Sequence, residues 1–324
     1  MIEEMMPDIY RIEVPLPKSP LKVLNAYLVK GQRRNLLIDT GFNMEESKAV
    51  LFKALKTLGV DLAQTDIFLT HLHPDHSGLI SAFTTESSVI YCGELDAYIL
   101  NATHTVSYWS ELKILFGLHG FPQQAIDEVI SKHPGCNYNP DRDHVFSFVK
   151  DGYILDIGGY YFHCVETPGH TPGHVCLYEP ERQILVSGDH ILDNITSNIS
   201  ELGITDPLGN YLKSLKKIEC LDIRLALPGH RRVMADVHRR ISELQTHHDH
   251  RLAEVLNILK DGPADAYQVA ARMTWDFAGT WDQFPLSQKW FAAGEAIAHL
   301  LYLYNKNQLR FTKADGNLAF ELIA

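Results

Sequence analysis

The sequence lacks the features that would place the protein in a membrane or in a secretory pathway. No run of apolar residues reaches the roughly 20 that a membrane-spanning helix needs. The N-terminus has neither the basic start nor the long apolar stretch of a signal peptide. The 5 cysteines are scattered and form no Cys-x-x-Cys pair, which is typical of proteins whose thiols stay reduced. We therefore expect a cytoplasmic protein with mostly buried, reduced cysteines.

Positive charge is also scarce. The chain of 324 residues has 29 Lys and Arg against 40 Asp and Glu, a formal net charge of −11. This balance disfavours a general binder of phosphate backbones, although it leaves room for a local basic groove.

No nucleophile-elbow motif of the Gly-x-Ser-x-Gly kind is present. With 45% apolar residues, the chain is long enough for one large domain and a small second one.

Histidine, by contrast, is concentrated in one stretch. His71, His73, Asp75 and His76 lie within six residues, directly after an apolar run that predicts a buried strand at 67–69. The alternate positions of His71 and His73 allow both side chains to leave an extended backbone on the same side. Imidazole and carboxylate together suit borderline divalent metals such as zinc, and also iron or manganese. A solvated His-rich loop is the alternative, and the downstream motifs disfavour it.

Three further turns each carry one potential ligand. His170 lies in a Thr-Pro-Gly-His turn, Asp189 in Ser-Gly-Asp, and His230 in Pro-Gly-His, each after a strand-like run. The motifs and their order resemble the metallo-β-lactamase superfamily, in particular its glyoxalase II-like hydrolases, over roughly residues 8–250. This resemblance implies an α/β fold, a four-layer αββα sandwich with two central sheets and helices outside.

The resemblance also implies a metal centre with two divalent ions, zinc first and iron or manganese as alternatives. His71, His73 and His170 would hold one ion, Asp75, His76 and His230 the other, and Asp189 would bridge them. Asp75 and Asp189 would also serve catalysis, because their carboxylates would offset part of the charge of the two cations. The two cations would lower the pKa of a shared water, and the resulting hydroxide would attack an electrophilic carbonyl or phosphorus near neutral pH. Asp39, in an Asp-Thr-Gly turn, is a candidate to orient a ligand from beneath the metals, although such an Asp can simply form the turn.

The pattern predicts two domains, a metallo-β-lactamase-like catalytic domain at 1–245 and a helical, winged-helix-like module at 246–324. The module ends in a predicted hairpin around 315–317. Its helix at 286–304 is apolar rather than basic, so we expect it to pack or to form a homodimer rather than to read DNA. A helical insertion at about 101–143 interrupts the first domain. Its aromatic residues are candidates for a pocket wall or for simple packing: Tyr108, Trp109, Phe116 and Phe121.

These patterns favour metal-dependent hydrolysis of a thioester or ester, with a small acyl thioester as the partner molecule. Metal-dependent cleavage of single-stranded RNA is the first alternative, and iron-dependent persulfide dioxygenation is the second. A scaffold without activity is disfavoured, because all seven candidate ligands are present.

Overall fold

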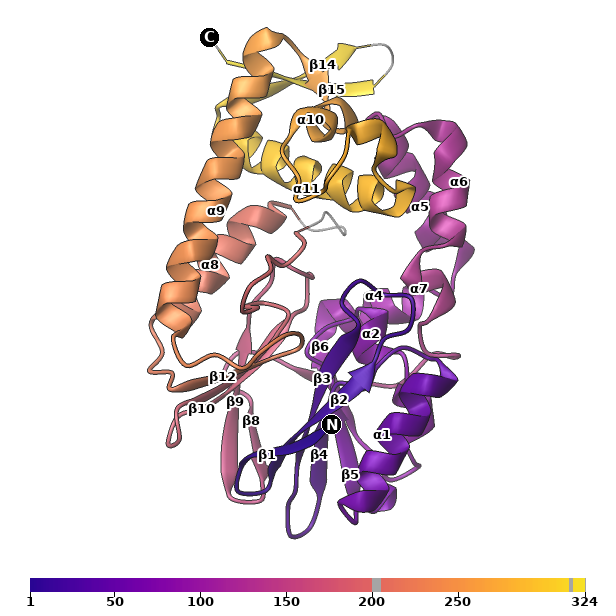
Figure 1. Cartoon of the computed structure of the whole chain (residues 1–324), viewed down its shortest axis with the longest axis vertical. Coiled ribbons are helices and arrows are strands. Elements are labelled where there is room, and N and C mark those ends of the chain that lie inside the picture. Colours follow the sequence, from indigo (N-terminus) through magenta and orange to yellow (C-terminus); the bar gives the residue numbers. More distant parts are fainter. Residues whose placement is uncertain (200–204, 315–316, 324) are drawn as a thin grey trace.

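Two β-sheets packed face to face form one half of the molecule in this computed structural model (Figure 1). The structure describes residues 1–199, 205–314 and 317–323. Within these residues the larger sheet has the order β1-β2-β3-β4-β5-β6-β7, with strands β4 to β7 parallel and the others antiparallel. Its strands are β1 (Ile2–Met6), β2 (Ile9–Pro15), β3 (Val23–Val29), β4 (Asn35–Ile38), β5 (Thr65–Phe68), β6 (Ile90–Gly93) and β7 (Ser147–Val149).

The smaller sheet has the order β12-β11-β10-β9-β8 in the described residues, and its only parallel pair there is β11 with β12. Its strands are β8 (Ile154–Ile157), β9 (Tyr160–Glu166), β10 (Val175–Glu179), β11 (Ile184–Gly188) and β12 (Leu225–Pro228). Side chains alternate between the two faces of a strand. In β3, Tyr27 and Val29 therefore lie between the sheets, whereas Ala26 and Leu28 face the helices outside.

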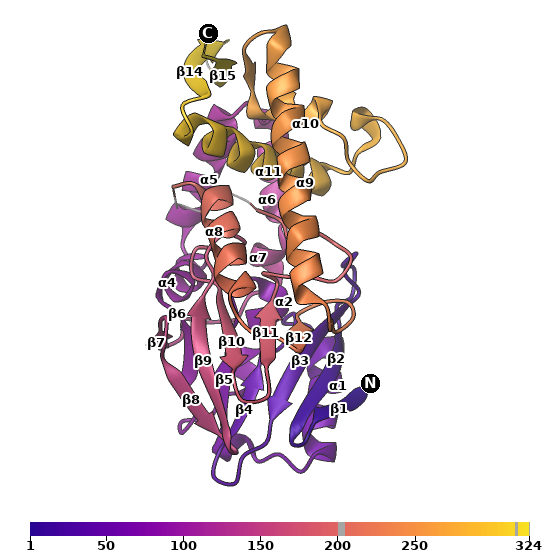
Figure 2. The same cartoon turned by 90° about the vertical axis from the view of Figure 1, so that its left-hand side faces the viewer.

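Helices cover the outer face of each sheet. The larger sheet is covered by α1 (Glu45–Thr57), α3 (Ile80–Phe83) and α4 (Glu94–Ala102), and the turn η1 (Leu62–Gln64) precedes β5. The smaller sheet is covered by α8 (Pro207–Glu219) and α9 (Val237–Ile258), which lie side by side (Figure 2). Asp206 caps α8 by accepting the Gly209 N–H, with Pro207 at the first helical position. The four-layer αββα sandwich is thus confirmed.

A module of helices and a small sheet follows at the far end of α9 (Figure 1). It comprises η2 (Leu259–Asp261), β13 (Ala264–Asp265), α10 (Ala266–Arg272), η3 (Trp281–Gln283), α11 (Leu286–Asn305), β14 (Leu309–Ala314) and β15 (Asn317–Leu322). Its described strands pair in the order β13-β15-β14, which confirms the hairpin; the predicted turn at 315–316 lies outside the described residues. Because α9 runs without a break through residue 245, the domain boundary predicted there stays a prediction.

The insertion at 101–143 forms helices that pack against α11 of this module. The helices are α5 (Val106–Leu118), α6 (Gln123–Ser131) and α7 (Pro134–Asn137). Phe116 stacks on Trp290 with ring centroids 3.5 Å apart, and Phe121 meets the same ring edge-on at 5.3 Å. Both phenylalanines are buried in this cluster, so their prediction as a pocket wall is wrong and the packing alternative is right.

Two expectations about the surface can be compared with the structure. Within the described residues, no helix is both long and apolar enough to cross a membrane. The five cysteines are all unpaired; three of them are buried and two, Cys136 and Cys220, are exposed.

Candidate metal centre

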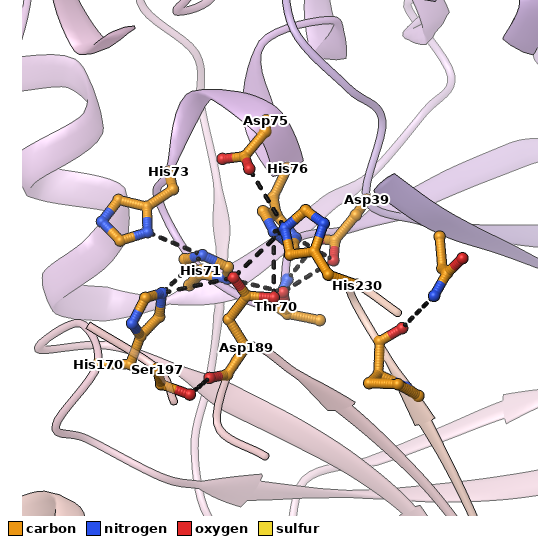
Figure 3. A network of polar contacts seen from close by, with 12 residues as sticks. Asp39, Thr70, His71, His73, Asp75, His76, His170, Asp189, Ser197 and His230 are labelled. Atoms are coloured by element: carbon orange, nitrogen blue, oxygen red, sulfur yellow. Dashed lines mark hydrogen bonds and ion pairs between the residues drawn. The ribbon is translucent and has the colours of Figure 1, made fainter. Parts of the chain in front are cut away.

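The candidate ligands lie in loops that follow the carboxyl ends of strands, and these ends meet at one edge of the sandwich. The His-rich motif follows β5 and enters α2 (Pro74–Ser77), with Pro74 at the first helical position. The loops after β9, β11 and β12 supply the remaining ligands. Figure 3 shows the seven candidate ligands together: His71, His73, Asp75, His76, His170, Asp189 and His230.

Three imidazoles form the first group. The ring nitrogens of His71, His73 and His170 that could hold a metal all lie within 4.8 Å of one another. His71 Nε2 is 3.3 Å from His170 Nε2 and 3.1 Å from His73 Nδ1. His73 therefore turns Nδ1 inward, whereas the other two rings turn Nε2 inward.

Asp75, His76 and His230 form the second group, again with ligand atoms within 4.8 Å of one another. The Nε2 atoms of His76 and His230 face each other at 3.3 Å, and Asp75 Oδ2 is 3.3 Å from His230 Nε2. Two of the three side chains are fully buried, and Asp75 is 9% exposed.

Asp189 lies between the two groups. Its oxygens are 3.4 Å from His76 Nε2 and 3.4 Å from His230 Nε2 in the second group, and 3.8 Å from His170 Nε2 in the first. Asp189 Oδ1 is buried and makes no hydrogen bond with any of the residues that the structure describes. A buried carboxylate oxygen without a hydrogen-bond donor, surrounded by imidazole nitrogens, fits a place where a cation binds.

Hydrogen bonds outside the cluster determine which ring nitrogens carry the protons. His170 Nδ1 lies 2.7 Å from the Asn198 carbonyl and His230 Nδ1 lies 2.8 Å from the Val23 carbonyl. A carbonyl oxygen can only accept, so both Nδ1 atoms carry a proton. In the neutral rings the Nε2 lone pairs therefore face the centre, which is the form that binds a metal.

Asp39 determines the position of the ring proton in two more histidines. It follows β4 and accepts hydrogen bonds from the Thr70 backbone N–H (2.9 Å) and hydroxyl (2.8 Å). Its Oδ2 is also 2.8 Å from His76 Nδ1. Because the Thr70 hydroxyl donates its only proton to Asp39, the hydroxyl oxygen accepts the hydrogen bond from His71 Nδ1 at 3.0 Å. One carboxylate thus directs Nε2 of His76, and through Thr70 that of His71, towards the centre.

Burial and charge separate the pKa values of the cluster. Burial, with the neighbouring His76, lowers the pKa of His71 well below its usual value, and burial lowers that of His73 to about 3. Burial also acts on His230, but the Asp189 carboxylate outweighs it and raises the pKa to about 10. Conversely, His230 and His76 outweigh burial at Asp189 and hold its pKa well below the usual range. The pocket therefore stabilises positive charge beside Asp189.

Known protein families match both parts of the chain. Residues 21–230 match the profile of the metallo-beta-lactamase superfamily. The chain belongs to this superfamily. Residues 252–323 match the C-terminal domain of metallo-beta-lactamase-like proteins, which covers the module after α9.

Several relatives and solved structures are similar over most of the chain. The Bacillus subtilis protein named probable metallo-hydrolase YqjP is 28% identical over 275 residues, covering 82% of this chain and 85% of that protein. An Emericella nidulans protein named atrochrysone carboxyl ACP thioesterase is 23% identical over 241 residues, covering 74% of this chain and 61% of the relative. The chain thus spans less than two thirds of that fungal relative. The crystal structure of a metallo-beta-lactamase family protein from Thermus thermophilus superimposes with a TM-score of 0.84 and 28% identity, covering 99% of this chain and 100% of that one.

Two residues that support the cluster, Thr70 and Asp96, were not predicted from the sequence. Thr70 directly precedes the His-rich motif, and this position was the only signal that could have identified it. Asp96 lies in the first turn of α4, where acidic residues are common for reasons of helix stability. In the structure its carboxylate is fully buried and hydrogen-bonded to two of the loops that carry candidate ligands.

Proposed function

We propose that the protein is a metal-dependent hydrolase that binds two divalent ions. The imidazole and carboxylate ligands favour zinc as these ions. His71, His73 and His170 would hold one ion, Asp75, His76 and His230 would hold the other, and Asp189 would be shared between them. The observation that carries this proposal is the pair of imidazole groups with inward-facing nitrogens on either side of one buried carboxylate.

Two divalent cations held by these residues would lower the pKa of bound water, so that hydroxide would be available near neutral pH. The protein's own part is to hold the ligands in their binding form. The outer nitrogens of three of these imidazoles donate to carbonyls or to Asp39, so in the neutral, metal-binding form of each ring the lone pair lies on the inner nitrogen. The carboxylates of Asp75 and Asp189 offset part of the cationic charge. The Ser197 hydroxyl donates to the Asp189 backbone carbonyl. This nearby serine therefore stabilises the loop and is not a covalent nucleophile.

A thioester or ester is the substrate class we propose. The net charge of −11 disfavours a polyanionic substrate. One relative is named as an acyl-carrier-protein thioesterase, although it shares only 23% identity. The helix of the C-terminal module that would read a nucleic acid is α11, and residues 292–294 and 296–298 along it are buried against the rest of the chain.

Activity assays on the metal-loaded protein test this proposal. We expect hydrolysis of acyl thioesters that is lost with a chelator and restored by added zinc. Cleavage of single-stranded RNA that weakens steeply with salt, without thioester turnover, would replace the substrate proposal with an endoribonuclease. Oxygen consumption with a persulfide, restored by iron alone, would replace it with a dioxygenase.

A further inference from the structure

A buried carboxylate outside the ligand cluster connects two of the loops that form it. Asp96 has no exposed surface, although it lies in the first turn of a helix on the outer layer. Its Oδ2 accepts the Leu72 backbone N–H at 2.9 Å and the Thr171 hydroxyl at 2.6 Å. Its Oδ1 accepts the Gly173 backbone N–H at 2.6 Å. The two oxygens therefore receive three hydrogen bonds, two of them from backbone groups.

The partners of Asp96 are adjacent to one set of candidate ligands. Leu72 lies between His71 and His73, and Thr171 directly follows His170. These three histidines form the first group of imidazoles. None of the hydrogen bonds that Asp96 makes in the described structure reaches the loops of Asp189 or His230. Its hydrogen bonds thus lie directly beside the residues of one candidate metal position.

Close backbone packing fixes Asp96 relative to the second loop. A side chain at Gly173 would place its Cβ 2.5 Å from the Asp96 backbone nitrogen, and one at Gly93 would lie 2.0 Å from the Gly173 carbonyl. Both distances are too short for any Cβ, so the loop approaches the start of α4 only because both residues are glycine. The carboxylate then satisfies the backbone N–H groups that this approach buries.

We propose that Asp96 is a positioning residue that sets the separation between the loop of His71 and His73 and the loop of His170. It thereby determines the affinity of the metal position that these three imidazoles form. The inference rests on the proposed two-metal function. Replacement by asparagine keeps the shape but substitutes an NH₂ donor for one acceptor oxygen. At least one of the N–H or O–H donors then loses its partner, and the two loops are no longer held at this separation.

Asp66 provides a matched control. It is also a buried carboxylate with three donors, two from Arg34 (both 2.6 Å) and one from the Val89 backbone N–H (2.8 Å). It lies on β5, the strand that leads to the His-rich motif, but before that strand's end and outside every group of candidate ligands. Asp66→Asn should therefore lower thermal stability without changing metal binding.

The experiment titrates metal-free full-length protein with zinc in competition with a chromophoric chelator, which resolves two stepwise binding constants. For Asp96→Asn we expect one constant to fall about 10- to 100-fold, the usual range when a group that orients a ligand is lost. The other constant should stay within about threefold of wild type. The visible spectrum of the cobalt-substituted protein should change for the weakened position only. Thr171→Val removes one of the three hydrogen bonds and should weaken the same constant by a smaller factor, and this variant decides the question if Asp96→Asn does not fold.

Three results would overturn the proposal. The first is unchanged constants in both Asp96→Asn and Thr171→Val with a fall in melting temperature like that of Asp66→Asn, which would make Asp96 purely structural. The second is an equal fall of both constants, which would mean that the whole centre is disrupted. The third is a wild-type protein that binds fewer than two ions, and that result would refute the proposed two-metal function as well.

Discussion

Asp39→Asn should weaken both metal positions, because one carboxylate orients a histidine in each. The residue has a backbone φ of 60°, a conformation that asparagine tolerates well, so this replacement adds little backbone strain. The Asn Oδ1 can still accept the Thr70 backbone N–H, which is bonded to Oδ1 of the aspartate. The effect therefore comes from Oδ2, which an NH₂ group replaces.

The new NH₂ group reverses the hydrogen bonds around it. His76 Nδ1, now 2.8 Å from Oδ2, must accept instead of donate, which moves the ring proton to Nε2 and removes the lone pair that faces the centre. The Thr70 hydroxyl, also 2.8 Å from Oδ2, must accept as well, and its proton then points to His71 Nδ1. His71 is driven to the same unfavourable tautomer. We expect each affinity to fall about 10- to 100-fold, or roughly 1.4 to 2.7 kcal/mol per ion.

Thr70→Val separates the two branches of this network. It removes the hydroxyl between Asp39 and His71 but leaves the contact between Asp39 and His76. Competition titration with zinc should show one weakened constant for Thr70→Val and two for Asp39→Asn. Equal effects of the two variants, or two unchanged constants in Asp39→Asn, would refute the assignment of tautomers.

Three further predictions concern other parts of the chain. Trp290→Ala removes the ring on which Phe116 stacks, and it should lower the free energy of unfolding by about 3 to 5 kcal/mol in urea denaturation. Glu295→Gln should remove a pH dependence of stability. Burial raises the pKa of this carboxyl from 4.5 to about 7, with only partial opposition from Arg251, whose Nε is 3.8 Å away. The stabilisation from the protonated carboxyl is complete below pH 4.5 and is lost as the pH rises through about 7, so the variant should gain up to about 3 kcal/mol over wild type at pH 8 and little at pH 4. Arg240→Met removes the guanidinium that donates to the Leu192 and Ile195 carbonyls, in the loop that follows Asp189, and should lower metal affinity several-fold in zinc titrations.

Each of these predictions has its own control. Tyr98→Ala removes an aromatic ring that is 57% exposed, and it should change the free energy of unfolding by less than about 1 kcal/mol. A loss in Trp290→Ala as small as that in Tyr98→Ala would contradict the packing of Phe116 on Trp290 as a source of stability. A pH-independent difference between Glu295→Gln and wild type would show that the raised pKa is wrong. Arg239→Met removes an exposed arginine that pairs only with Glu243 among the described residues, and it should leave zinc affinity unchanged. A loss of affinity as large as that of Arg240→Met would point to a general charge effect.

The sequence was sufficient to predict that the candidate ligands lie together, because each of them stands beside a local signal. Pro74 and the Pro-Gly turns before His170 and His230 mark where a strand ends and a loop begins. The carboxyl ends of β9, β11 and β12 lie at the same edge of the smaller sheet, and the His-rich motif after β5 of the larger sheet meets them once the two sheets pack together.

Contacts between distant segments were not predictable in the same way. The stacking of Phe116 on Trp290 joins the insertion to the C-terminal module, and no periodicity in either helix encodes that pairing. The same holds for Asp96, whose burial depends on a loop that approaches through Gly93 and Gly173. A carboxylate at the start of a helix resembles any solvated acidic residue until its hydrogen-bond partners are known.

The proposed function requires that the chain bind two metal ions with Asp189 between them. Equilibrium dialysis against zinc, followed by elemental analysis, measures the number of ions per chain directly. We expect two ions for the wild-type protein and a sharp fall for Asp189→Ala, since this variant would leave two cations facing each other without their shared anion. Two tightly bound ions and full activity in Asp189→Ala, or a single ion in the wild-type protein, would contradict it.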